Sequence, residues 1–160
     1  MATWNKKNVA KELIMSLHTK YGTDLLTSSI LARRDIITGS DVQYFLEQDK
    51  RFLHCPFLFD TMEDACDRIL DAKEEGEKVL IFGDRDVDGI TSTAIMVSFL
   101  TKKGAKVNAY IPDRQNEGYG INKAAVKKIS DGGATLLISV DTGITAFEET
   151  KYAKELGCDV

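Results

Sequence analysis

Several features that would define a class of protein are missing from this 160-residue chain. No stretch approaches the roughly 18 consecutive apolar residues of a membrane span, and no basic segment followed by an apolar one opens the chain. The three cysteines are scattered without a CxxC pair, so we expect reduced thiols and a cytoplasmic location. The two histidines lie far apart in the sequence, so no zinc-binding pattern is visible.

The chain also lacks the basic excess of proteins that bind nucleic acid through bulk charge. Its 21 Lys and Arg residues are outnumbered by 25 Asp and Glu residues, which gives a net charge of −4. Any contact with nucleic acid must therefore use a local basic patch, or metal ions that offset the carboxylates. A hydrophobic content of 43% is ordinary for a soluble globular protein with a real core.

The N-terminal part is predicted to be helical. Helices are expected at 5–22, 24–35 and 40–48, and the last of these begins with a capping box formed by Ser40 and Gln43. The first helix has one apolar face, made of Val9, Leu13, Ile14 and Leu17. A connection over 54–60 precedes a strongly amphipathic helix at 61–76, whose inward residues are predicted to be Met62, Ala65, Cys66, Ile69 and Leu70.

From residue 78 the pattern changes to alternating strands and helices. Strands are predicted at 78–83, 106–112 and 135–141, and helices at 89–104, 122–133 and 146–157. This alternation predicts an α/β fold with a doubly wound, Rossmann-like parallel sheet. We therefore expect two domains, an N-terminal helical region at 1–76 and the first part of an α/β domain at 77–160. Residues 158–160 resemble the start of a fourth strand, so a fragment is expected, with a natural edge strand as the alternative.

The turn "GDRDVDG" after the first predicted strand carries three alternating aspartates, Asp84, Asp86 and Asp88. An EF-hand calcium loop begins in this way, but it needs a glutamate at its twelfth position, which is Ile95 here. The flanking residues predict a strand before the turn and a helix after it. In extended chain a spacing of two points side chains to the same side, so the three carboxylates can converge.

A second acidic turn, "SVDTGI", follows the third predicted strand and contains Asp141. Sites in open parallel sheets form at the carboxyl ends of strands, where the strand order reverses. If the first and third strands are neighbours, Asp141 joins the other three aspartates. Converging carboxylates repel one another unless a cation lies among them, and oxygen ligands suit Mg²⁺ or Mn²⁺. The alternative is a solvated loop in which Asp88 caps the next helix and Asp141 orders the turn at Gly143.

A third segment, "IPDRQNEGYGIN", follows the second predicted strand. Arg114 is of the type that donates two hydrogen bonds to phosphate, and Tyr119 offers a stacking face for a base. The glycines, Gly120 among them, indicate a tight backbone. The alternative is an ordinary polar loop. Neither acidic turn matches a glycine-rich phosphate loop, so a nucleotide fingerprint is disfavoured.

These segments together resemble the DHH phosphoesterases. "GDRDVDGITSTAIM" is similar to the family's motif I, DxDxDG, and "ISVDTGITAFEE" is similar to motif II. "YIPDRQNEGYGIN" looks like the segment between these motifs in RecJ-like, single-stranded-DNA-specific exonucleases. The upstream chain also resembles that branch at Trp4, "ILARRDI", "FL" at 45–46 and "PFLFDTMEDACDRI".

The resemblance implies a catalytic domain with two divalent ions, Mn²⁺ or Mg²⁺. It implies that Asp86, Asp88 and Asp141 are catalytic ligands, with Asp84 a ligand or a neighbour of one. It also implies 5′→3′ hydrolysis of single-stranded DNA in repair and recombination, with Arg114, Tyr119 and Gly120 as substrate-binding candidates. A helicase or a single-strand-binding protein is a possible partner.

Three departures from the family pattern limit this expectation. Motif III, the DHH signature itself, does not occur in the 160 residues, and neither do the later ligands and the C-terminal substrate-binding domains of the family. Arg85 stands where Tyr is common, and Thr142 stands where Asn is common. About half a metal site is therefore expected, and the chain is predicted to be inactive alone. The alternatives are a phosphodiesterase of short oligonucleotides or cyclic dinucleotides, and a non-catalytic repair or replication module.

Overall fold

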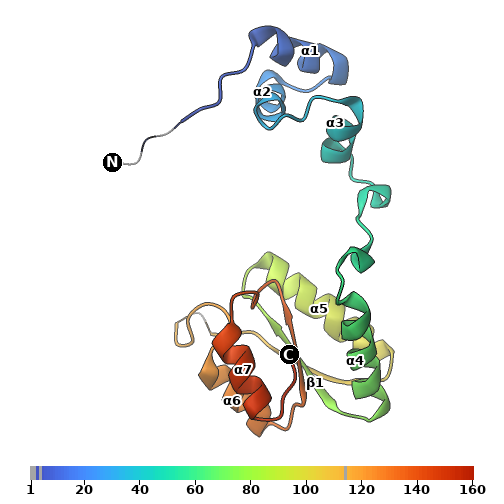
Figure 1. Ribbon diagram of the computed structural model, residues 1–160, viewed down its shortest axis with the longest axis vertical. Helices are drawn as coiled ribbons and strands as arrows, with labels where there is room; N and C mark the ends of the chain where they lie inside the picture. The colour runs from blue at the N-terminus through green and yellow to red at the C-terminus, as the bar shows by residue number, and fades with distance from the viewer. Residues whose placement is uncertain (1–2, 4, 114) are drawn as a thin grey trace. The chain divides into compact units, whose positions relative to one another are not determined.

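The computed structural model describes residues 3, 5–113 and 115–160, so Trp4 and Arg114 lie outside the described residues. The chain forms two compact units, 1–55 and 56–160 (Figure 1). The sequence places the helix before residue 76 with the N-terminal region, whereas the structure groups it with the sheet. The domain division at residue 76 stays a prediction, and the compact units divide at residue 55.

The first unit is a small helical cluster. Its helices are α1 (Lys11–Tyr21), α2 (Leu25–Arg33) and α3 (Gly39–Leu46). The predicted apolar face packs into the hydrophobic cluster of the unit, whose buried residues are Leu17, Leu31, Ala32 and Val42. Val9 also packs there but lies before the helix, because the helix begins at Lys11 and not at residue 5. The predicted capping box is wrong. The N-cap of α3 is Thr38, whose hydroxyl accepts a hydrogen bond from the Asp41 amide, so the helix begins one residue before Ser40.

The second unit opens with a short 3₁₀ turn, Pro56–Leu58, and helix α4 (Met62–Glu74); another short 3₁₀ turn, Lys50–Phe52, ends the first unit. Ala72 is fully buried and Ile69 packs beside it against the sheet. The predicted inward face is wrong in part, because Ala65, Cys66 and Leu70 are exposed. The helix contacts the sheet through its last turns, so the burial follows that contact and not the whole apolar stripe.

The sheet has three parallel strands in the order β2–β1–β3. Its strands are β1 (Lys78–Gly83), β2 (Lys106–Tyr110) and β3 (Leu136–Val140), and its helices are α5 (Val87–Lys102), α6 (Lys123–Asp131) and α7 (Phe147–Glu155). The predicted α/β fold is confirmed, and the first and third strands are neighbours as the metal hypothesis requires. Residue 159 forms a single parallel bridge to Leu136, at the position of the predicted fourth strand.

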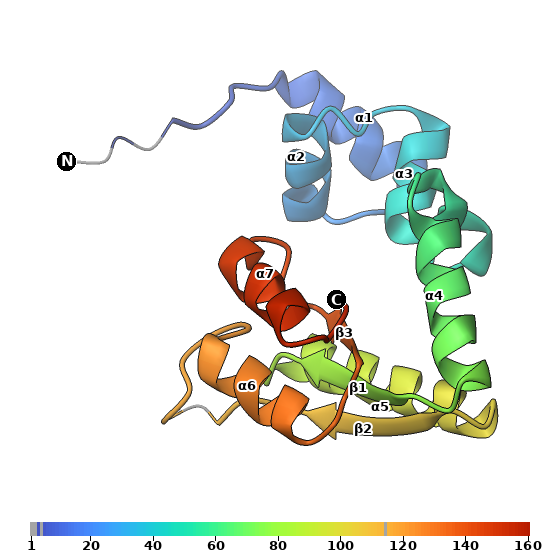
Figure 2. The same cartoon turned by 60° about the horizontal axis from the view of Figure 1, so that its bottom comes forward.

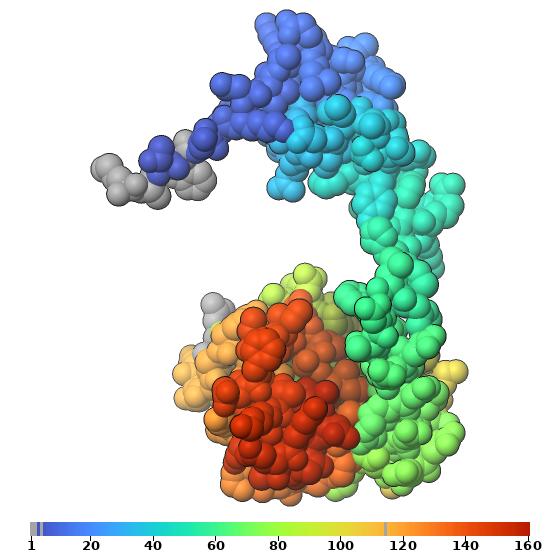
Figure 3. Space-filling view, viewed as in Figure 1, coloured from blue at the N-terminus to red at the C-terminus, as the bar shows by residue number. Residues whose placement is uncertain are grey.

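Helices cover both faces of this sheet, as Figure 2 shows. Val79 and Ile81 of β1 point to the face covered by α4 and α5, whereas Phe82 points to the face covered by α6 and α7. Burial on both faces explains why the strands have nearly continuous apolar runs. In the space-filling view the second unit is a packed body with α7 on the near side (Figure 3). Among the described residues, no helix is long and apolar enough to cross a membrane.

Candidate metal centre

The register of the sheet places the two acidic turns next to each other at the carboxyl edge of the sheet. Gly83 at the end of β1 pairs with Val140 at the end of β3. The next residues along the two strands are Asp84 and Asp141, which therefore leave the sheet side by side. The predicted convergence at the carboxyl ends of the strands follows directly from this pairing.

Two glycines allow helix α5 to begin close to the end of β1. A Cβ at Gly89 would overlap the backbone of Asp84, and a Cβ at Gly83 would overlap the Thr93 hydroxyl. Both glycines are buried, so neither clash could be relieved into solvent. The turn between them is held by Asp86, which is the N-cap of α5 and accepts a hydrogen bond from the Gly89 amide at 2.9 Å. The motif glycine is thus a requirement of close packing.

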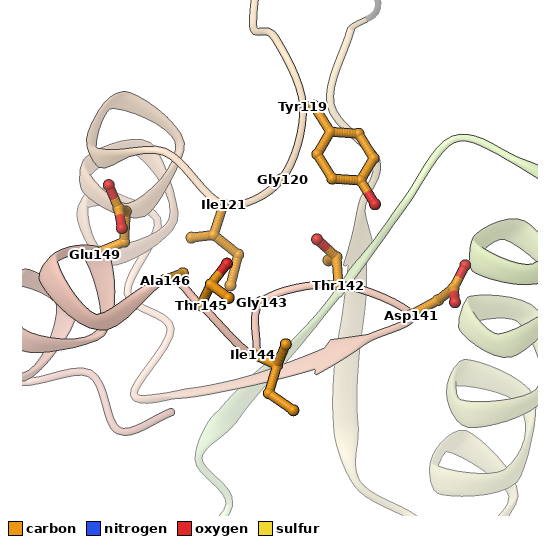
Figure 4. Close-up of a pocket in the computed structure, with 10 residues that line it drawn as sticks. All are labelled: Tyr119, Gly120, Ile121, Asp141, Thr142, Gly143, Ile144, Thr145, Ala146 and Glu149. Atoms are coloured by element: carbon orange, nitrogen blue, oxygen red, sulfur yellow. The ribbon is translucent and has the colours of Figure 1, made fainter. Parts of the chain in front are cut away.

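Asp84, Asp86 and Asp141 each offer a carboxylate oxygen within 4.8 Å of the others. Asp84 is buried and the other two are exposed, so the cluster lies at the surface with one ligand beneath it. Asp141 has a left-handed backbone with φ of 57°, which is uncommon outside glycine although aspartate tolerates it better than most residues. This conformation turns the chain sharply after β3 and, in Figure 4, the Asp141 side chain points toward α5.

The cluster raises the pKa of Asp141 above its ordinary value of 3.8. Partial removal of the carboxyl group from water is the largest cause, followed by repulsion from Asp86 and a hydrogen bond with it. Asp88 and Asp84 add smaller repulsive contributions. Proximity of like charges favours the protonated form, and a bound cation removes that preference.

The cluster passes a simple test of fit for a divalent cation. The Oδ1 atom of Asp84 is buried and has no hydrogen-bond partner among the described residues. Such an atom costs free energy unless a positive group approaches it. Three converging carboxylates are a hard-oxygen donor set suited to Mn²⁺ or Mg²⁺, so the residues match the predicted ion.

Asp88 does not join the three-carboxylate group. It lies in the first turn of α5, while the capping role that the alternative gave to Asp88 belongs to Asp86. Asp88 is still close enough to raise the pKa of Asp141 through repulsion. Its role as a ligand therefore stays a prediction, and the metal roles of the other three aspartates stay predictions as well.

The loop over residues 111–122 is held by Glu117, which the sequence did not single out. Its carboxylate accepts hydrogen bonds from the Tyr110 hydroxyl and, at 2.7 Å, from the Asp113 amide. Burial, together with the contact with Glu117, raises the pKa of Tyr110 to about 12. Asn122 donates a hydrogen bond from its side chain to the Glu117 carbonyl and also caps α6. These hydrogen bonds tie the described residues of the loop to the end of β2 and to the start of α6.

A hollow of about 390 Å³ lies between this loop and the turn after β3. One wall contains Tyr119, Gly120 and Ile121, and the other contains Asp141 and the residues up to 146 with Glu149 (Figure 4). Tyr119 is 72% exposed, so its ring is available to a ligand. The structure therefore brings Tyr119 and Gly120 to the edge of the carboxylate cluster.

Comparison with protein families agrees with this geometry. Residues 78–160, slightly more than half of the chain, match the model described as "DHH family, N-terminal domain". The chain belongs to the DHH family. The matched part begins at β1 and contains both acidic turns, so the family assignment rests on the same elements as the site.

Curated relatives narrow the likeness to RecJ. The chain is 41% identical over 157 residues to the single-stranded-DNA-specific exonuclease RecJ of Bacillus subtilis, covering 98% of this chain and 20% of that protein. It is 33% identical over 100 residues to RecJ of Escherichia coli, covering 62% of this chain and 17% of that protein. The chain therefore spans about a fifth of the length of these relatives, and the predicted RecJ-like membership is confirmed.

Two solved structures share the fold. A crystal structure of exonuclease RecJ bound to manganese matches with a TM-score of 0.55 and 36% identity, over 59% of this chain and 24% of that one. A structure of RecJ in complex with Mn²⁺ from Thermus thermophilus matches with a TM-score of 0.60 over 94% of this chain and 20% of that one. At 21% identity, the second match concerns the fold alone.

Proposed function

We propose that this chain carries part of the metal centre of a RecJ-like 5′→3′ exonuclease specific for single-stranded DNA, acting in repair and recombination. The proposal is supported by family membership, by the identity with RecJ proteins and by the carboxylate cluster. The observation that carries it is the buried Oδ1 of Asp84, which finds no hydrogen-bond partner in the described part of the chain and lies within a group of three carboxylates.

Asp84, Asp86 and Asp141 would hold Mn²⁺ or Mg²⁺, and Asp88 would join them. When bound, two such ions supply Lewis-acid catalysis and an activated water for phosphodiester hydrolysis. Asp86 fixes its own position by capping α5, and the Gly89 contact keeps the helix start against Asp84. Tyr119 and Gly120 would line the path of the nucleotide, and Arg114 would contact a phosphate.

The described residues contain one group of three carboxylates, which is fewer ligands than two ions need. We therefore propose that the 160-residue chain alone releases no nucleotides, and that residues outside it complete the centre. We also propose a cytoplasmic location and contact with a helicase or a single-strand-binding protein.

The test uses a protein that contains this chain at the length of its RecJ relatives. It is supplied with Mn²⁺ and offered 5′-labelled single-stranded DNA, duplex DNA, short RNA and a cyclic dinucleotide. Selective release of mononucleotides from single-stranded DNA, lost in Asp141→Ala and retained in Asp131→Asn, supports the proposal. Asp131 is the matched control because it is an exposed aspartate on α6 that pairs with Lys127.

Two other results would contradict the exonuclease proposal. Cleavage of only the short RNA or the cyclic dinucleotide would move the chain to the phosphodiesterase branch of the family. Absence of cleavage, with the fold and Mn²⁺ binding intact, would favour a non-catalytic module.

A further inference from the structure

Arg85 lies between two of the clustered aspartates, yet its guanidinium contacts neither of them within an ion-pair distance among the described residues. Its Nη1 atom donates a hydrogen bond of 2.8 Å to the carbonyl of Gly118, 33 residues along the chain. Arg85 therefore connects the β1–α5 turn to the loop over residues 111–122.

The direction of this side chain is unexpected, because an arginine beside carboxylates is stabilised electrostatically by pairing with them. Arg85 instead donates a hydrogen bond to a backbone carbonyl. Hydrogen bonds with one charged partner are stronger than those between two neutral groups. The guanidinium of Arg85 therefore does not neutralise the carboxylates of Asp84, Asp86 and Asp141, which stay available to a cation.

The Gly118 carbonyl belongs to a tightly turned part of the loop. Gly118 and Gly120 both have left-handed backbone, with φ of 73° and 76°, and Tyr119 projects between them. Glu117 fixes the loop on the side of Tyr110, as described above. On the other side, a Cβ at Gly120 would lie 3.6 Å from the Thr142 hydroxyl, so the two walls of the hollow approach each other there. The position of the Gly118 carbonyl therefore sets the position of Tyr119 above the hollow.

We propose that Arg85 is a positioning residue that holds the Gly118–Gly120 turn, and with it Tyr119, as a wall of the single-stranded DNA path beside the metal centre. The role for DNA rests on the proposed function, whereas the hold on the loop does not. Arg85 acts through the loop backbone and needs no contact with the reacting phosphate.

The first experiment measures amide hydrogen exchange in the chain without metal or DNA. Loss of one hydrogen bond to a charged donor is expected to speed exchange over 115–122 by about tenfold in Arg85→Ala. Arg85→Lys, which keeps a cationic donor, is expected to restore part of the protection. Arg51→Ala removes an exposed arginine of the first unit and is expected to change nothing over 115–122.

The second experiment measures binding and turnover. In the RecJ-length protein, Arg85→Ala is expected to raise KM for single-stranded DNA by about tenfold with a smaller change in kcat, because a misplaced wall weakens binding more than chemistry. Mn²⁺ affinity of the 160-residue chain is expected to stay within about twofold of the parent, since Arg85 leaves the carboxylates free. Partial recovery of KM in Arg85→Lys separates this role from a general loss of fold.

The outcomes distinguish this proposal from the proposed function. Unchanged exchange over 115–122 in Arg85→Ala overturns the positioning role, whatever the nuclease assay gives. A loss of Mn²⁺ affinity in Arg85→Ala as large as the rise in KM overturns it too, because Arg85 would then position the metal ligands and not the loop. If exchange is faster in Arg85→Ala but the unsubstituted RecJ-length protein does not cleave DNA, the role of Arg85 in holding the loop is supported. Only the proposed exonuclease function is then contradicted.

Discussion

Asp86 serves two physical purposes at one position. Its side chain caps α5 through the Gly89 amide, and its carboxylate belongs to the candidate metal group. The sequence indicated the metal role from the alternating aspartates, and the alternative placed a cap at Asp88. A cap two residues earlier could have been found from Gly89, because the capped amide lies three residues after the capping residue.

The two roles of Asp86 can be separated by substitution. Asp86→Asn keeps a side-chain oxygen for the cap but removes the charge and its repulsion with Asp141, so the unfolding free energy is expected not to fall while Mn²⁺ binding is lost. Asp86→Ala removes both and is expected to cost about 1 kcal/mol in addition. Thermal unfolding and Mn²⁺ titration of the two variants check this. Equal stability of the two variants would contradict the capping role.

The raised pKa of Asp141 predicts a pH-dependent stability. Because the folded pKa lies above the ordinary value of 3.8, the contribution of Asp141 is present below that value and is lost as pH rises through the raised pKa. Asp141→Asn cannot ionise, so in EDTA at pH 7 its melting temperature is expected to exceed that of the parent. The difference is expected to shrink as pH falls toward 4. A lower melting temperature for Asp141→Asn at pH 7 would contradict the repulsion.

At the scale of elements, the sequence predicted each strand and helix of the second unit within a few residues. The strands could be predicted because burial on both faces gives continuous apolar runs. The strand order was only a condition of the metal hypothesis, and the observed order β2–β1–β3 meets that condition. The inward face of α4 could not be predicted from its apolar spacing alone. Only the contact with the sheet decides that Ala72 is buried while Leu70 is 52% exposed.

The loop over residues 111–122 was the least predictable element. Its anchors are Glu117 bonded to Tyr110, and Arg85 bonded to a carbonyl 33 residues away. Neither contact follows a spacing rule: the first depends on how the loop folds back onto β2, and the second joins two turns that only the folded sheet brings together. The candidate substrate residue Arg114 lies outside the described residues, and its role stays a prediction.

The β1–α5 turn gives a prediction at this scale. Gly89→Ala adds a methyl group against the backbone of Asp84, and overpacking of this kind is expected to cost about 1–3 kcal/mol or more. The same change is expected to displace the ligands and reduce Mn²⁺ binding. Gly39→Ala is the control, because its Cβ would meet only the Tyr21 hydroxyl at an ordinary 3.5 Å. Thermal unfolding of both variants is the measurement, and equal melting temperatures would contradict the close approach.

At the scale of the whole molecule, the acidic net charge makes DNA binding dependent on the metal centre. A chain of net charge −4 that is proposed to act on a polyanion has to lower the repulsion locally. The carboxylate cluster does so only when cations are bound, because they offset the negative charge at the carboxyl end of the sheet. A metal-free chain is therefore expected to repel single-stranded DNA at this edge.

The most direct test of the central claim is a titration of the 160-residue chain with Mn²⁺, followed by the loss of the electron paramagnetic resonance signal of the free ion. The account predicts saturable binding that is weakened at least about tenfold in Asp84→Asn, which removes the charge beside the unpartnered oxygen, and is unchanged in Asp131→Asn. Absence of saturable binding, or equal binding by the parent and Asp84→Asn, would contradict a metal centre formed by Asp84, Asp86 and Asp141.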